Sequence, residues 1–327
     1  MIAQRRAIVD IFLVAFLWGV PPVFIHFFAR YLDADTQNLW RYLSALVFLY
    51  PYGWWTGQRL WPADRRAWQR LAIAAGILAS YQVCFTLSLY YAMPVLISLL
   101  IQLELIVAIA LSCLFFHDER RVARSPWFMF GASAALAGAV GMVVFSREFV
   151  LAEAHRAAWN NFTLAVALVV GAAALWGTYS VAVKWCIELA PPSTAFTAIA
   201  TVASVVFLIL SATRGHVGAV AAAPPRVLLM VFLSGVACIG VAQILYVRAI
   251  QRLGVGICNT VILTSPIVAA VTSRLVFDER LTALQTASAL VLLAGAASAI
   301  RANNNRREAV SPCDLSKNTG QRPSLPN

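Results

Sequence analysis

Charged residues are scarce in this sequence. Only 12% of its 327 residues are Asp, Glu, Lys or Arg, whereas an ordinary globular domain carries about 25%. Hydrophobic residues make up 61%, and the mean hydropathy is +0.77. This balance excludes an ordinary soluble domain and predicts a membrane protein. The net charge of +11 does not indicate nucleic-acid binding, because the basic residues are scattered between apolar runs and form no continuous patch.

Motifs that would carry chemistry are also missing. The six cysteines form no CxxC pair, and no His lies at a metal-ligand spacing from them, so we expect neither a disulfide nor a bound metal. We find no nucleophile–base pair and no phosphate-binding loop, which argues against an enzyme and against a cofactor. No small-residue cleavage site closes the first apolar run, so we expect this run to be retained as a helix.

Long apolar runs are what the sequence has instead. A membrane-spanning helix needs roughly 20 mostly apolar residues. Prolines, glycines and charged residues separate the runs, as is typical of loops. The polar segment 301–327 has too little apolar surface to fold alone, and we expect it to be a disordered cytoplasmic tail. We predict an all-α integral membrane protein with ten transmembrane helices, at about 7–29, 36–55, 70–91, 94–116, 125–145, 161–185, 192–212, 227–249, 255–276 and 282–300.

The distribution of basic residues predicts the orientation of these helices. With the N-terminus in the cytoplasm, 17 of the 25 Lys and Arg residues fall on the inner side and seven on the outer side, while Arg41 lies within a span. Cytoplasmic loops carry an excess of Lys and Arg. Both termini are therefore predicted to be cytoplasmic, although the bias is weakest in the second half.

Two short motifs repeat at nearly the same spacing. Leu-Trp-Gly occurs at 17–19 and 175–177, and Asp-Glu-Arg occurs at 118–120 and 278–280. In each half, the first motif lies in the first helix and the second lies between the fourth and fifth helices. Because five helices is an odd number, the second half must be inverted relative to the first, a plan that is common in secondary transporters.

This repeat defines the predicted domains. Residues 1–148 form a first five-helix repeat, residues 149–160 form a linker, and residues 161–300 form a second, inverted repeat. The two Asp-Glu-Arg motifs then lie on opposite faces of the membrane, where a duplicated catalytic pair is not expected. We interpret them as helix-boundary residues that suit the N-terminal turn of the next helix.

These features together resemble the drug/metabolite transporter superfamily, and the EamA-type family in particular. The resemblance rests on ten spans in two halves, Trp-Gly in both first helices, Arg41 early in the second helix, and an acidic residue with Arg after the fourth. It covers nearly all of residues 7–300, and it implies an exporter or exchanger of small metabolites in the bacterial inner membrane. In two respects the sequence departs from the family pattern. Ile106 stands where the family has a proline, and the second half has no counterpart of Arg41.

The first helix contains a candidate part of a substrate path. Pro21 and Pro22 have no N–H, so two carbonyls in the preceding turn lose their helical donors. Freed carbonyls at membrane depth are tolerated where they face protein or a wet cavity. Either the helix breaks here and lines the path together with Trp18, or the prolines form a packing kink near the outer surface.

The sequence allows two interpretations of Arg41. It could attract an anionic group such as a carboxylate. Alternatively, it could reach the outer interface or pair with Asp33 or Asp35, because it lies only ~8 Å into its helix at 1.5 Å per residue.

Polar and aromatic residues recur in the third helix of each half. Tyr81 and Gln82 correspond to Gln243 and Tyr246, and buried glutamines in a membrane need partners, so these side chains should face inward. Either they bind a substrate with polar and planar parts or they join neighbouring helices. The predicted cavity set is Trp18, Tyr81, Gln82, Trp176, Tyr179, Gln243 and Tyr246.

Glu104 is the most deeply placed ionisable residue. A charge near the bilayer midplane costs at least ~2.5 kcal/mol, so Glu104 should face the interior or be protonated. At an offset of 160 its counterpart is Thr264, and both begin a stripe of small or polar residues that we expect to face one cavity. Glu104 is a candidate coupling residue that carries protons or meets a cationic group. The alternative is a protonated Glu that only joins two helices.

The sequence thus predicts a secondary transporter of a small metabolite, such as an amino acid or an aromatic amphiphile. Its expected partners are the lipid bilayer, the solute and, as a candidate coupling ion, the proton. A passive facilitator or channel would share the same cavity, and an integral membrane enzyme is the third reading. Both a monomer and a homodimer are compatible with the sequence.

Overall fold

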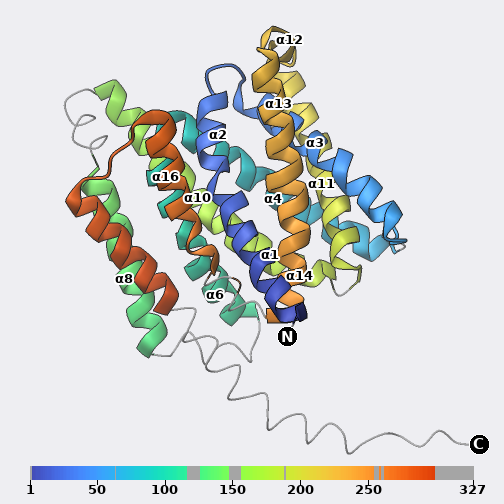
Figure 1. Ribbon diagram of the computed structural model, residues 1–327, viewed down its shortest axis with the longest axis horizontal. Coiled ribbons are helices and arrows are strands. Elements are labelled where there is room, and N and C mark those ends of the chain that lie inside the picture. Colours follow the sequence, from blue (N-terminus) through green and yellow to red (C-terminus); the bar gives the residue numbers. More distant parts are fainter. Residues whose placement is uncertain are drawn as a thin grey trace, which may run out of the picture.

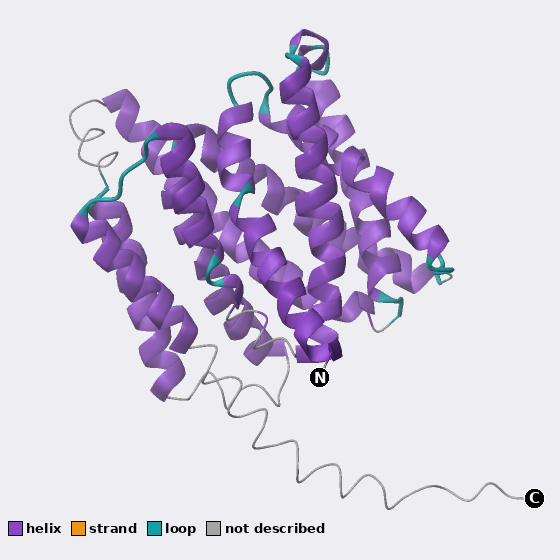
Figure 2. Cartoon of the chain, viewed as in Figure 1, coloured by secondary structure: helices purple, strands orange, loops and turns teal. Residues whose placement is uncertain are grey.

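The computed structural model describes residues 2–62, 64–115, 126–146, 156–187, 189–253, 258 and 261–298. Within these ranges the chain folds into helices and short connections, and it contains no strand (Figure 2). This confirms the all-α prediction. The first Asp-Glu-Arg motif, most of the predicted linker and the polar tail lie outside the described residues.

The helices of the first half follow the five predicted apolar runs. Two runs are divided: a break at Val20 separates α1 from α2, and a 3₁₀ turn at Ile101–Leu103 separates α5 from α6. The bounds are α1 Ile2–Gly19, α2 Pro21–Phe28, α3 Ala34–Trp55, α4 Arg65–Tyr91, α5 Pro94–Leu100, α6 Glu104–Phe115 and α8 Pro126–Val144.

The second half repeats this order. A π-helical turn at Gly235–Val241 joins α13 to α14, and α10 begins at Arg156, inside the predicted linker. The bounds are α10 Arg156–Ile187, α11 Pro192–Arg214, the short α12 Ala219–Ala222, α13 Pro225–Ser234, α14 Ala242–Leu253, α16 Ser265–Phe277 and a last helix, Ala283–Ser298.

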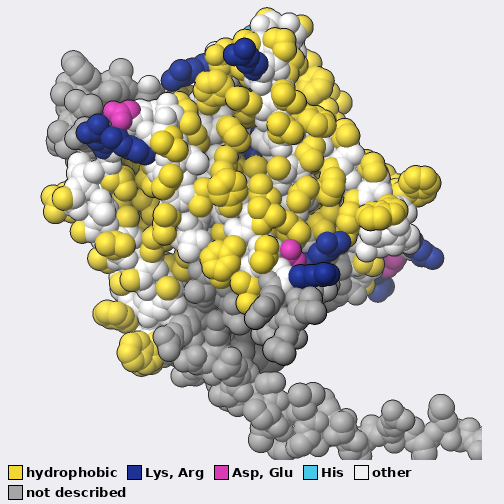
Figure 3. Space-filling model, viewed as in Figure 1, with side chains coloured by type: hydrophobic (Ala, Val, Ile, Leu, Met, Phe, Trp, Pro, Cys, Tyr) yellow, Lys and Arg dark blue, Asp and Glu magenta, His cyan; other side chains and the backbone are white. Residues whose placement is uncertain are grey.

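Among the described residues, six stretches are long and apolar enough to cross a membrane: Arg6–Phe28, Arg65–Tyr91, Pro126–Val144, Asn160–Val183, Ser193–Arg214 and Pro225–Tyr246. Three shorter apolar helices accompany them, at Pro94–Ala108, Ser265–Phe277 and Ala283–Ser298. The structure therefore supports a multi-span membrane fold, whereas the number of ten spans stays a prediction. Apolar side chains cover most of the face shown in Figure 3, and Lys and Arg lie near its upper and lower edges.

Local sequence explains several helix starts. The Asp33 carboxylate accepts a hydrogen bond from the Thr36 N–H at 2.9 Å and caps α3. Prolines occupy the first turns of several later helices, where a missing N–H costs nothing. The last helix starts with a capping box, in which Thr282 and Gln285 each accept the other's backbone N–H.

The two halves run in opposite senses through the molecule. In Figure 1, α1 starts at the lower face and α10 starts at the upper face. Arg70, near the start of α4, donates to the Trp185 carbonyl near the end of α10 at 2.8 Å. Similarly, Arg214 at the end of α11 forms an ion pair with Asp35 at the start of α3, at 2.8 Å. Both contacts join helices of different halves in antiparallel pairs.

The repeated Trp-Gly motifs explain how the halves cross. A Cβ on Gly19 would lie 2.5 Å from the Ser265 carbonyl oxygen and 2.6 Å from the Cβ of Val268 on α16. A Cβ on Gly177 would lie 2.9 Å from the Ala108 nitrogen on α6. Each glycine thus lets the first helix of one half approach the fourth helix of the other.

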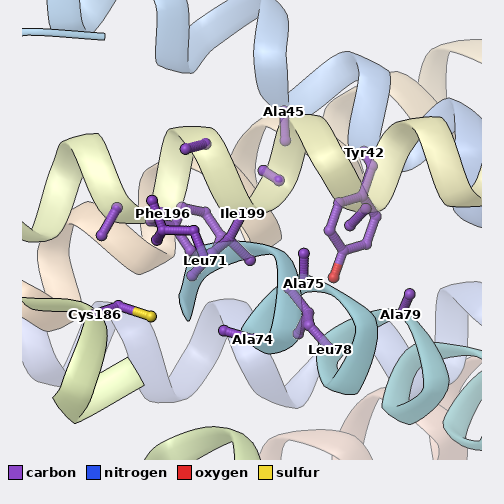
Figure 4. Close-up of a cluster of buried hydrophobic side chains, with 14 of the residues drawn as sticks. Tyr42, Ala45, Leu71, Ala74, Ala75, Leu78, Ala79, Cys186, Phe196 and Ile199 are labelled. Carbon is purple, nitrogen blue, oxygen red and sulfur yellow. The ribbon is translucent and has the colours of Figure 1, made fainter. Parts of the chain in front are cut away.

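The buried core around these crossings is rich in small side chains. Figure 4 shows α3, α4 and α11 meeting around Tyr42, with several alanines of α4 between larger neighbours. Lipid tails are as apolar as the helices, so helices in a membrane associate mainly through close packing. Small side chains allow this close approach. The labelled members are Tyr42, Ala45, Leu71, Ala74, Ala75, Leu78, Ala79, Cys186, Phe196 and Ile199.

Candidate functional site

A cavity of about 130 Å³ lies between the two halves. Its walls come from the first four helices of the first half and from α10, α11, α14, α16 and the π-helical turn of the second. The lining residues are Trp18, Gly19, Pro21, Pro22, Arg41, Tyr42, Leu78, Tyr81, Gln82, Phe85, Ser98, Ile101, Gln102, Glu104, Trp176, Phe196, Cys238, Ile239, Gln243, Ile262 and Ser265.

The break in the first helix opens onto this cavity. Pro21 and Pro22 start α2 and are buried, and both line the cavity together with Trp18. The Trp18 indole N–H donates to the Cys238 carbonyl at 3.1 Å, which ties the end of α1 to the π-helical turn. Of the two readings of these prolines, the structure shows a broken helix at the cavity wall.

An aromatic cluster connects the two repeated motifs. The rings of Trp18 and Trp176 meet edge to face, with centroids 6.2 Å apart. The ring centroid of Tyr246 lies 5.0 Å from that of Trp18, and the ring centroid of Tyr81 lies 4.7 Å from that of Trp176. Tyr179 packs at 5.3 Å from Trp176. Trp18, Tyr81 and Trp176 line the cavity, whereas Tyr179 and Tyr246 stand behind them as packing partners.

Gln82 lines the cavity and also joins two helices. Its amide N–H₂ donates to Asn38 Oδ1 at 3.3 Å and to Thr86 Oγ1 at 3.1 Å. Thr86 in turn donates to Asn38 Oδ1 at 2.8 Å. These bonds tie α4 to α3, so the donor end of Gln82 is engaged in the scaffold. Gln243, its counterpart in the second half, also lines the cavity.

Arg41 is buried, and only 3% of its surface is exposed. Its Nε donates to Ser234 Oγ on α13 at 3.2 Å. The alternative pairing with Asp33 or Asp35 is not found, because Asp35 binds Arg214 and Asp33 accepts from the N–H groups of Thr36 and His216. The side chain lines the cavity and does not reach the outer interface.

Glu104 also lines the cavity, but its helix is not continuous as expected. It is the first residue of α6, directly after the 3₁₀ turn that contains Gln102. Gln102 donates to the Ser98 carbonyl at 3.4 Å and to Ser265 Oγ at 3.5 Å. Both fourth helices therefore meet at the cavity beside Glu104.

The residues that follow Glu104 and Thr264 at spacings of four in the two predicted stripes do not line the cavity where the structure describes them. Ala108 and Val268 instead face the glycines of the Trp-Gly motifs. Thr264 donates to its own helix, to the Val261 carbonyl at 2.6 Å, and its neighbour Ser265 takes the place expected for it on the cavity wall.

Several cavity residues were not predicted from the sequence. Ser98 and Gln102 lie in apolar runs, Ser265 directly follows Thr264, and none of the three carries a repeat signal. The break between α5 and α6, which contains Gln102, is not marked by a proline in this half.

The second Asp-Glu-Arg motif lies at the upper face and joins the halves. Asp278 adopts a left-handed conformation with φ of 55° and pairs with Arg274. Glu279 accepts hydrogen bonds from Ser273 Oγ and, at 3.3 Å, from the Val95 N–H in the first turn of α5. The motif was expected to cap the following helix, but Glu279 instead binds a helix of the other half, and Thr282 caps the following one.

Two carboxyl groups at this face have opposite pKa shifts. Burial raises the pKa of Glu279 above its ordinary 4.5, although the bonds from Ser273 and Val95 lower it in part. For Asp33, burial also raises the pKa, but the N–H groups of Thr36 and His216 outweigh it, so the pKa lies below the ordinary 3.8.

Comparison with known proteins agrees with a fold built from two related halves. Residues 5–144 and 163–301 each match the model of a family described as "EamA-like transporter family", one match for each half. The chain belongs to the EamA-like transporter family. It is a multi-pass membrane protein built from two EamA repeats, as its sequence motifs predicted.

A solved structure titled "Crystal structure of protein" has the same fold as this EamA chain. The TM-score is 0.63 over 93% of this chain and 98% of that one, at 16% sequence identity. At this identity the likeness concerns the fold alone. No curated protein matches the sequence significantly.

Proposed function

We propose that this EamA protein is a secondary transporter that exports a small metabolite across the bacterial inner membrane by alternating access. The observation that carries the proposal is the cavity between two inverted halves, with a Trp-Gly motif from each half in its wall. Exchanging the conformations of two related halves would open such a cavity alternately to each side. Both termini are then cytoplasmic, in agreement with the distribution of Lys and Arg.

The lining supports an amphiphilic solute, such as an amino acid or a related aromatic compound. Trp18, Tyr81 and Trp176 offer planar apolar surface, and Gln82 and Gln243 offer amide groups. Ligand sites commonly combine an apolar wall with a few polar groups that fix orientation.

Glu104 supports coupling to protons. A carboxyl group in the wall of an intramembrane cavity can take up a proton from one side and release it to the other. A passive facilitator would use the same cavity without this step.

Transport by the purified protein in proteoliposomes tests the proposal. The vesicles are loaded with candidate amino acids and aromatic metabolites, and efflux is followed with and without a pH gradient. Efflux that a pH gradient accelerates supports the coupled transporter, and efflux that ignores the gradient supports a facilitator. Conversion of a solute without its movement would indicate an enzyme.

A further inference from the structure

Arg41 is a buried cation, and the surrounding helices provide hydrogen-bond partners for only part of its guanidinium group. Its Nε is used by Ser234, but its Nη1 is buried and has no hydrogen-bond partner among the residues that the structure describes. Within the same ranges, no carboxylate lies within ion-pair distance of it. A buried guanidinium without a counter-charge is unfavourable in a low-dielectric interior, so this group is expected to bind an anion.

The cavity contains a second unsatisfied atom of the opposite kind. The Gln102 amide donates to Ser98 and Ser265, while its Oε1 is buried and has no donor among the described residues. Buried acceptors of this kind are rare, because an unmade hydrogen bond is costly. Arg41 and Gln102 both line the same cavity, Arg41 on α3 and Gln102 in the turn between α5 and α6.

We propose that the cavity binds a small monocarboxylate, with the carboxylate at Arg41 Nη1 and an O–H or N–H donor of the same solute at Gln102 Oε1. The inference rests on the proposed function and names the class of its solute. With its Nε engaged by Ser234, the Arg41 guanidinium has fewer donors left, which suits one carboxylate better than a phosphate, which needs more donors. The volume of about 130 Å³ is close to that of a cavity that holds benzene, roughly 150 Å³, so the solute is small.

Binding of matched probes to the protein in lipid nanodiscs tests this assignment. The probes are 4-hydroxybenzoate, its uncharged amide 4-hydroxybenzamide, and benzoate, which lacks the hydroxyl donor. Calorimetric titration of the wild type should show 4-hydroxybenzoate binding at least about tenfold more tightly than the amide, as expected for a charge-assisted hydrogen bond. Benzoate should bind more weakly than 4-hydroxybenzoate by a smaller factor.

Three variants separate the two contacts. Arg41→Gln should lose the preference for carboxylate over amide, and Arg41→Lys, which keeps the charge, should retain part of it. Gln102→Met should lose the preference for 4-hydroxybenzoate over benzoate but keep the preference for carboxylate over amide. Arg41→Lys and Gln102→Met keep the test decisive if Arg41→Gln does not fold.

A wild type without preference for either carboxylate over the amide, whether all probes bind or none does, would overturn the proposal. Retention of the full preference by Arg41→Gln would overturn it too. Binding in a nanodisc requires no movement across the membrane. The carboxylate subsite can therefore fail while proteoliposome transport succeeds, or hold while transport fails.

Discussion

Glu104 is the residue on which proton coupling depends. It lines the cavity at the start of α6, directly after a turn that interrupts the fourth helix. Glu104→Gln keeps the shape and hydrogen bonding of the side chain but cannot ionise. It should abolish the pH dependence of transport between pH 5 and 8, while expression and membrane insertion stay intact.

Proteoliposome flux at several pH values measures this effect. Asp278→Asn is a suitable control, because Asp278 is exposed at the upper face and should leave the pH profile unchanged. If Glu104→Gln transports like the wild type across this pH range, Glu104 only joins helices.

Gln82 and Gln243, the two cavity glutamines that the repeat relates, should behave differently despite their equivalent places. Gln82→Ala removes two hydrogen bonds that tie α4 to α3 and should lower the free energy of unfolding by about 1–3 kcal/mol. Gln243→Ala should lower transport with little effect on stability. Denaturant unfolding and flux measured on both variants check this. Unchanged transport by both for every accepted solute would remove the glutamines from the site.

At this scale the sequence predicted the residues that repeat or carry a charge, and it missed uncharged polar residues that do neither. Trp18, Trp176 and Gln82 were found because each half supplies a comparable signal. Arg41 was found as a charged residue inside a span, but its partner could not be deduced, since Ser234 lies in the other half and far along the chain. Gln102 was missed because nothing local distinguishes it.

Among the elements, the helix crossings at the Trp-Gly motifs depend on glycine. Gly177→Ala would place a methyl group 2.8 Å from Val107 Cγ1, and Gly19→Ala would place one 2.6 Å from Val268 Cβ. Each substitution should lower the free energy of unfolding by about 1–3 kcal/mol through overpacking.

Gly171 provides a matched control in the same helix as Gly177. A Cβ there meets nothing within 4 Å, so Gly171→Ala should stabilise α10 by about 0.5–1 kcal/mol. Denaturant unfolding in detergent gives both values. Equal effects of Gly171→Ala and Gly177→Ala would contradict a close crossing at the motif.

The contact of Glu279 with α5 should respond to pH in the opposite sense to the cap of α3. The raised pKa of Glu279 means that its contribution to stability is fully present below about pH 4.5 and is lost as the pH rises through its folded-state value. The lowered pKa of Asp33 means that its contribution is present above about pH 3.8 and is lost as the pH falls.

The free energy of unfolding, measured as a function of pH, separates the contributions of Glu279 and Asp33. Relative to the wild type, Glu279→Gln should become comparatively more stable as the pH rises, and Asp33→Asn should lose its disadvantage at low pH. Parallel pH profiles for the wild type and Glu279→Gln would refute the burial of this carboxyl group.

The sequence located the helices better than their interruptions. Apolar length and flanking prolines were enough to predict where the helices lie. The π-helical turn at Gly235–Val241 was not predicted, because it arises from packing: Gly235 lies directly against the backbone carbonyl of Arg41 in the other half. The role of Glu279 was likewise set by a contact with α5 that no local pattern records.

Across the whole molecule, each half packs its first helix against the fourth helix of the other half. Gly19 meets Val268, and Gly177 meets Ala108, so one contact becomes the other when the offset between the halves is applied. The motif offsets in the sequence predicted this inversion. They could not predict the size of the cavity, which depends on how far the halves close on one another.

The inverted repeat is the central claim, and sidedness tests it most directly. Single cysteines are placed at Arg121 and Thr282, after the two Asp-Glu-Arg motifs, in a chain whose six native cysteines are replaced. A membrane-impermeant thiol reagent added from outside to intact cells should label the cysteine at 282, and the cysteine at 121 should react only after the membrane is opened. Equal labelling of both positions from outside would contradict the account.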